Sequence, residues 1–147
     1  MAAQWPLVHA RLVALLPTLP GWPADVFDGP PVTGNAPTRY ATVGYVFGED
    51  AGGDFRTDTT NAYRIEEAGS VRGEIVATTG SADLPTVRQQ AFAMADALEA
   101  SVRADRTLGG VLSPDGLVTL RFDVVPAQTQ QGATQRLAFS VDYITRT

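Results

Sequence analysis

Apolar residues recur at helical spacing in two segments of the chain. In residues 4–16 the apolar positions follow the helical period closely, and Pro6 falls in the first turn, where its missing N–H costs nothing. In residues 84–104 an apolar stripe runs along one face, with Asp83 placed as an N-cap. The stripe consists of Val87, Ala91, Met94, Leu98 and Val102. Both segments are therefore predicted to be helices.

β-Branched and aromatic residues mark the predicted strands. In the last of these, Phe139, Val141 and Tyr143 alternate with Ser140, Asp142 and Thr145, which predicts a strand with one buried face. The extended segments are predicted at residues 25–28, 39–47, 63–65, 71–79, 117–125 and 136–145.

Two polar segments interrupt these elements. Residues 48–61 (GEDAGGDFRTDTTN) are too polar to enter a core and exceed the usual length of a connection, so we expect a loop that is mobile in the free protein and ordered by a partner. Residues 128–134 are expected to form a long polar loop between the last two strands, which would pair as an antiparallel hairpin.

The order of the elements predicts an α+β fold. Strands grouped on either side of a long helix favour a mainly antiparallel β-sheet with two principal helices packed on one face. A chain of 147 residues, 44% of them hydrophobic, is a common size for one domain and can build its own core. Residues 1–147 are therefore expected to form a single domain without internal repeats.

Composition excludes several classes of function. The chain has no cysteine, so thiol nucleophiles, zinc–thiolate sites, iron–sulfur clusters and disulfides are ruled out. Its net charge is −5 and every basic residue is an arginine, which disfavours tight binding of nucleic-acid backbones. No apolar run approaches the length that spans a bilayer, and the amino end lacks the basic region of a signal peptide. We therefore expect no membrane association and a soluble, intracellular protein.

The residues that carry chemistry do not form a recognisable catalytic set. His9 is the one histidine, and neither a serine nor an acid lies near it in the sequence. Asp50, Asp54 and Asp58 recur every four residues, which is not the spacing of a calcium loop. The glycine-rich run VGYVFGEDAGGDF has neither a dinucleotide fingerprint nor a Walker lysine. The sequence therefore predicts no catalytic residue, no cofactor and no metal site, and the protein is not expected to be an enzyme.

Three segments carry a resemblance to a known family. They are LLPTLPGWPADVFDGPPVTGNAPTRYATVGYV, VRGEIVATTGSADLPTVRQQAFAMADALEASVRADRTLGG and VPAQTQQGATQRLAFSVDYITR. Together they resemble the tail terminator proteins of long-tailed bacteriophages. The resemblance covers nearly the whole chain and departs at residues 48–61.

The resemblance implies a structural subunit of the virion. Such a protein would form a ring, commonly a hexamer, that caps the tail tube, ends its polymerisation and joins the tail to the head. Its partners would be copies of itself, the major tail tube protein and the head–tail connector, with DNA passing through the lumen without specific binding. It would be found at the head-proximal end of the tail, after assembly in the host cytoplasm.

The two polar segments are the expected partner contacts. Arg56 is the expected anchor, because arginine is enriched at the energetic centres of interfaces. The residues assigned to these contacts are Asp50, Asp54, Phe55, Arg56, Asp58, Gln128, Gln130 and Gln131.

Two other readings of the sequence stay open. One is a neck or head-completion protein that acts as a connector adaptor in the phage. The other is an enzyme or small-molecule binding domain, which a deep apolar pocket with convergent polar groups would favour.

Overall fold

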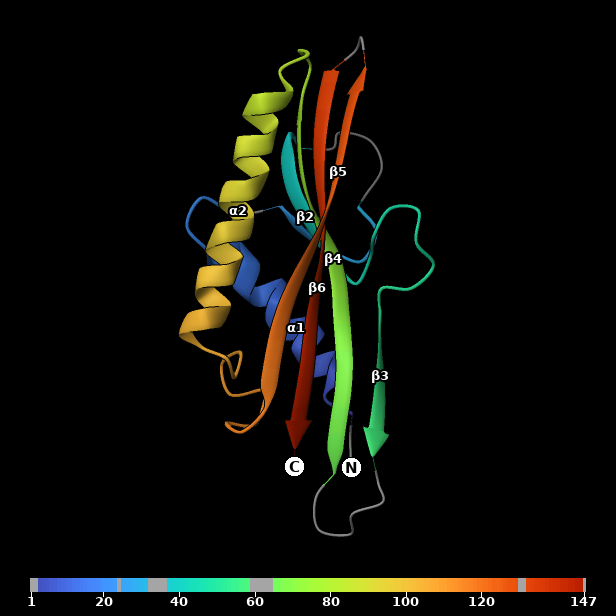
Figure 1. The fold of residues 1–147 in the computed structure, drawn as a ribbon, viewed down its shortest axis with the longest axis vertical. Helices are drawn as coiled ribbons and strands as arrows, with labels where there is room; N and C mark the ends of the chain where they lie inside the picture. Colours follow the sequence, from blue (N-terminus) through green and yellow to red (C-terminus); the bar gives the residue numbers. More distant parts are fainter. Residues whose placement is uncertain (1–2, 24, 32–36, 59–64, 130–131, 147) are drawn as a thin grey trace.

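The computed structural model describes residues 3–23, 25–31, 37–58, 65–129 and 132–146. Helix α1 (Trp5–Leu15) continues into a 3-10 turn, η1 (Leu16–Thr18). In the sequence, helix α2 (Leu84–Ala104) follows the first four strands and precedes the last two. The strands are β1 (Val26–Asp28), β2 (Arg39–Val43), β3 (Gly53–Asp58), β4 (Glu66–Thr79), β5 (Leu117–Thr129) and β6 (Gly132–Arg146). The predicted α+β class, with a mainly antiparallel sheet and two principal helices, is confirmed (Figure 1).

The sheet is organised around β4. Its order is β1-β2-β4-β6-β5, and β3 also pairs with β4. β6 pairs with β4 along the whole of β4. The opposite edge of β4 is divided between β2, which pairs with residues 73–77, and β3, which pairs with residues 66–71. The pair β1–β2 is parallel, and every other pair of described strands is antiparallel.

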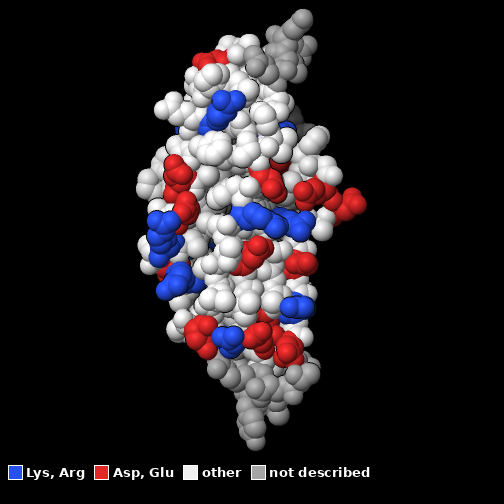
Figure 2. Space-filling model, in the orientation of Figure 1, with Lys and Arg blue, Asp and Glu red and all other residues white. Residues whose placement is uncertain are grey.

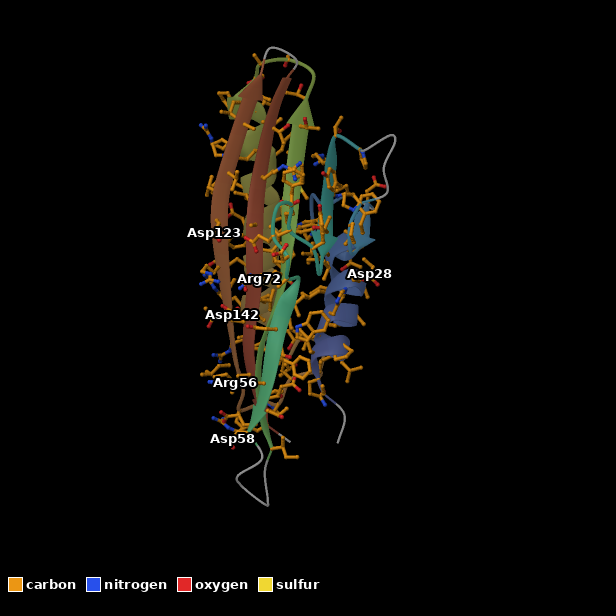
Figure 3. All side chains as sticks on the ribbon, turned by 90° about the vertical axis from the view of Figure 1, so that its right-hand side faces the viewer. Asp28, Arg56, Asp58, Arg72, Asp123 and Asp142 are labelled. Atoms are coloured by element: carbon orange, nitrogen blue, oxygen red, sulfur yellow. The ribbon has the colours of Figure 1, made fainter. Side chains whose placement is uncertain are left out.

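Both helices pack on the same face of this sheet. α1 contributes Val8 and Leu12 to the core, η1 adds Leu16, and the predicted stripe of α2 is buried in full. They meet sheet residues that alternate along their strands, namely Val71, Ile75, Leu137, Phe139 and Val141. The Nε1–H of Trp22 donates to the carbonyl oxygen of Met94 (2.8 Å), which ties the segment after η1 to α2. No helix in the described residues covers the opposite face of β3, β4, β6 and β5 (Figure 3).

The start of α2 follows the predicted capping. The Asp83 carboxylate accepts from the backbone N–H of Thr86 (3.2 Å), and Pro85 lies in the first turn. This cap holds the pKa of Asp83 below its ordinary value, because hydrogen bonds from the hydroxyl and the backbone of Thr86 favour the charged form.

Several predicted strand boundaries differ from those of the structure. β2 ends at Val43 rather than at residue 47, because Gly44 takes a φ of +79° and turns the chain out of the sheet. β4 begins at Glu66 rather than at residue 71, since both of its edges find partners there. The strand predicted at residues 63–65 falls mainly outside the described residues, and Ile65 is not in a strand.

The prediction of a long polar loop at residues 128–134 was also wrong for most of this segment. β5 and β6 stay paired as far as Thr129 and Gly132, because backbone hydrogen bonds form regardless of side-chain polarity. In β6, Thr145 was assigned to the polar face, but it lies two positions from Tyr143 and is buried like it.

The prediction that residues 48–61 form one loop was wrong for residues 53–58. These residues form β3, paired with β4 in an antiparallel register. Five of the six positions are exposed, so this edge strand depends on the backbone of β4 and not on apolar burial. Residues 59–61 lie outside the described part of the chain.

The burial of Leu98 gives a direct test of how α2 is seated. Leu98 is 0% exposed within the core, so Leu98→Ala should lower the free energy of unfolding by about 2–5 kcal/mol in urea titrations. The exposed Gln90 provides a control on the same helix, and Gln90→Ala should change it by less than about 0.5 kcal/mol. Equal stability of the two variants would show that this helix face does not pack as described.

Candidate functional site

The uncovered face of the sheet carries its polar side chains in rows that cross β5, β6, β4 and β3. The strand registers place Arg121, Ser140 and Arg72 side by side in one row. The row on one side of it holds Thr119, Asp142, Ser70 and Asp54, and the row on the other side holds Asp123, Ala138, Glu74 and Thr42. Basic and acidic groups therefore alternate along the length of the molecule (Figure 2). We call this surface the banded face.

A hollow of about 550 Å³ lies on the banded face. Its lining from β3 and β4 includes Asp54, Arg56 and Arg72, and its lining from β5 and β6 includes Arg121 and Asp142. Apolar side chains of Ala68, Leu117 and Ile144 complete it. A smaller hollow of about 170 Å³ shares Arg72 and Arg121 with it. Figure 3 shows Arg56, Arg72, Asp142 and Asp123 spread over this face.

Some charges of the banded face are satisfied within the subunit. Arg72 pairs with Glu49 (3.2 Å). The carboxylates of Asp54 and Asp142 accept from the hydroxyls of Ser70 (2.9 Å) and Ser140 (2.7 Å). Within the described residues, by contrast, the side chains of Arg56, Arg121 and Asp123 make no ion pair and no hydrogen bond. These three charges are available to a partner.

Residues 44–52 connect β2 to β3, and both ends of this segment bind the backbone of β4. The N–H of Gly44 donates to the carbonyl oxygen of Arg72 (2.6 Å), and the N–H of Arg72 donates to the carbonyl oxygen of Gly52 (2.8 Å). A Cβ atom on Gly52 would overlap the carbonyl oxygen of Gly44. The close approach of the two ends therefore requires glycine at position 52.

This segment covers an ion pair on the banded face. Arg136 and Glu74 lie 2.9 Å apart, and the Glu74 side chain is only 4% exposed. The N–H of Phe47 donates to Glu74 (3.3 Å), and the Arg136 guanidinium lies 4.9 Å from the centre of the Phe47 ring. Burial raises the pKa of Glu74, against the opposing effects of Arg136 and of the Phe47 N–H.

The structure gives His9 an acidic partner that sequence spacing does not reveal. Its Nε2 lies 2.7 Å from Asp28 Oδ1, across nineteen positions of sequence. Trp5 contacts the His9 ring edge-on, with the ring centres 5.1 Å apart. No serine or threonine hydroxyl in the described chain hydrogen-bonds to His9, so the pair joins α1 to β1 without a nucleophile.

A second buried contact fixes the start of α1. Glu67 accepts from the Tyr143 hydroxyl (2.6 Å) and from the backbone N–H of Gln4 (2.9 Å). Burial, reinforced by Glu67, raises the pKa of the Tyr143 hydroxyl well above its ordinary value. Tyr143 therefore stays protonated and serves as a donor to Glu67.

The described residues contain no candidate metal cluster and no helix that could span a membrane. In them, no group of three or more histidine, aspartate or glutamate side chains is placed to hold a metal ion. None of the helices they form is long and apolar enough to cross a bilayer.

The residues predicted to contact partners fall into separate places. Asp54, Arg56 and Asp58 share the banded face of β3, whereas Phe55 points to the other face and is 51% exposed. Asp50 is exposed in the segment 44–52. Gln128 belongs to β5 at the hairpin end, away from β3 (Figure 1), and Gln130 and Gln131 lie outside the described residues.

Sequence reasoning missed the contribution of the other strands to this surface. Arg72, Arg121 and Asp142 line the hollow, and each is the polar partner in an alternating strand. That alternation was the available signal, but the strand registers that align these residues cannot be read from it.

Comparison with known proteins assigns no family to the chain, since no protein-family model and no curated protein matches it.

The raised pKa of Glu74 predicts how its replacement depends on pH. A carboxyl whose pKa is higher in the folded state than its ordinary value of 4.5 stabilises the fold below that value and loses this contribution as pH rises. Glu74→Gln removes the titration, so the stability of this variant relative to the parent should increase between pH 4 and pH 7.

Urea titrations across this pH range provide the measurement. Glu99→Gln, at an exposed carboxylate on α2, is the matched control for the loss of one carboxylate. A relative stability of Glu74→Gln that falls with rising pH would mean that the attraction of Arg136 outweighs burial.

Proposed function

We propose that the protein is a structural subunit of a phage tail, which closes into a ring on the end of the tail tube, ends its polymerisation and presents it to the head. The observation that carries this proposal is a layer that has one helix-covered face and has β3 and β5 among its edge strands. Together with the resemblance to tail terminators, it favours a protein that acts through surfaces.

The directions of the strands suit head-to-tail assembly. From β3 through β4 and β6 to β5, every neighbouring pair is antiparallel, so β3 and β5 themselves run in opposite directions. Copies related by rotation about an axis that is inclined to the strands, as in a β-barrel, would therefore meet with antiparallel edges and a staggered register. Head-to-tail contacts that close on rotation produce a ring.

The charge pattern is compatible with a subunit around a DNA channel. Each basic row of the banded face has an acidic row beside it, and the chain carries a net charge of −5. Phosphate binding depends on accumulated positive charge, so such a surface would not retain DNA.

The two alternatives differ in what they would require. A neck adaptor would use the same kind of surface, and its gene would not lie just upstream of the tail-tube gene. A small-molecule binding domain would use the hollow, whose volume suits a ligand. The hollow combines Arg56 and Arg121 with Asp54 and Asp142 on an open sheet surface, which favours a protein partner over an enclosed ligand.

Deletion of the gene in its phage tests the proposal. We expect full heads beside abnormally long, unjoined tails in electron micrographs, because nothing would stop the tube from growing. Supplying the intact gene in trans should restore tails of normal length. Tails of normal length with leaking heads would move the protein to the neck, and normal infectious particles would overturn both structural roles.

A further inference from the structure

We infer that neighbouring copies of the chain join the β3 edge of one subunit to the β5 edge of the next, with Arg56 opposite Asp123 and Phe55 opposite Val124. This inference rests on the proposed ring, and it adds the residues and the register of the contact. A second copy of this chain is thus the partner of both edges.

Both edges offer unpaired backbone. In the described sheet β3 pairs with β4 alone and β5 pairs with β6 alone, so the outer edge of each strand lacks a strand partner. β5 extends over 13 residues and presents Leu117, Val124 and Val125, each at least half exposed. Long exposed edges with apolar side chains are templates for pairing with another chain.

Side-chain alternation leaves few registers to consider. Arg56 and Asp123 lie on the banded face, while Phe55 and Val124 lie on the helix-covered side. Pairing must preserve these faces and keep all six residues of β3 within β5, so Arg56 can face Thr119, Arg121, Asp123 or Val125 of the neighbour, but not the residues between them.

Charge separates these four registers. Opposite Arg121, Arg56 would meet a like charge, and Asp54 would meet Asp123, both of which are unfavourable. Opposite Val125, Arg56 would gain no charge partner, and Asp58 would meet the like charge of Asp123. Opposite Thr119, only Asp54 would gain an opposite charge, from Arg121, and Phe55 would meet Leu120, which already packs against its own core. Opposite Asp123, Arg56 gains an opposite charge.

The favoured register also matches apolar groups. Phe55 is 51% exposed and Val124 is 53% exposed, and this register places them opposite each other on one face. Asp58 then lies opposite Arg121. Pro126 falls opposite Gly53 at the end of β3 and, lacking an N–H, suits the end of a ladder. Six residues of β3 therefore pair with residues 121–126 of the neighbour.

A second copy is favoured as the partner because one chain carries both complementary edges, with Arg56 on β3 and Asp123 on β5. Arg56 and Asp123 each lack a side-chain partner within the described subunit, and they lie near opposite edges of the sheet. Every copy in a closed ring can satisfy both. A two-fold pairing of β5 with β5 would place Arg121 opposite Asp123 but would leave the β3 edge uncovered.

Cysteine cross-linking tests the register directly, because the chain has no cysteine of its own. In the full chain at about 1 mM, Phe55→Cys with Val124→Cys should form disulfides on mild oxidation and give a ladder beyond the dimer on non-reducing gels, since directly opposed Cβ atoms lie about 4.5–5.5 Å apart. Either single variant should stop at traces of dimer.

Two matched pairs report two of the competing registers. Phe55→Cys with Phe122→Cys and Phe55→Cys with Leu120→Cys keep the same face and shift the register by two and four residues, and both should cross-link far less. Circular dichroism would confirm that each variant is folded. Stronger cross-linking of either control, or none in the Val124 pair, would overturn the inferred contact. Efficient cross-linking of Leu120→Cys with Val124→Cys that stops at dimers would also overturn the inferred contact, and would indicate that β5 pairs with β5.

A charge exchange tests the same contact without a covalent bond. Arg56→Asp should weaken self-association about tenfold in sedimentation, and Asp123→Arg in the same chain should restore it, because the pair is re-formed with exchanged signs. Failure of the second substitution to restore association would contradict the pairing. The deletion phenotype is read separately, so long tails with no cross-link would leave the ring standing and reject only this register.

Discussion

The backbone of Arg72 binds two glycines at once, because its carbonyl oxygen accepts from Gly44 and its N–H donates to Gly52. Through this contact the chain leaves the edge of β4 at the end of β2 and returns to the same edge at the start of β3. The other edge of β4 is then free to pair with β6 over its full length. The position of the edge strand β3 and the rows of the banded face follow from this arrangement.

The helices add the second constraint. Because α1 and α2 pack on one face, the core lies entirely on that side and the opposite face of β3, β4, β6 and β5 stays open. Backbone pairing aligns polar side chains across four strands of the open face. A surface of this kind is suited to contact with another protein, and its alternating charges would favour one register over others.

The sequence was most informative where apolar periodicity and capping agree. The stripe of α2 and the Asp83 cap are both as predicted, since burial and end effects act within one helix. β3 was missed because an exposed edge strand has no apolar period to detect. The hollow was missed for a related reason, since Arg72, Arg121 and Asp142 become neighbours only through strand register.

The candidate contacts were predicted in part. Asp54 and Arg56 do lie on the proposed surface, but as members of a strand and not of a loop. His9 and Asp28 show the same limit, because a pair so far apart in sequence carries no local signal.

The central claim is that this chain assembles through its surfaces into a closed ring on a tail tube. Native mass spectrometry of the purified protein, alone and mixed with the major tail tube protein of the same phage, tests it most directly. The account predicts a single closed species whose mass is an integral multiple of the subunit, six being expected, and which binds the tube protein. A protein that remains monomeric both alone and in the mixture would contradict it.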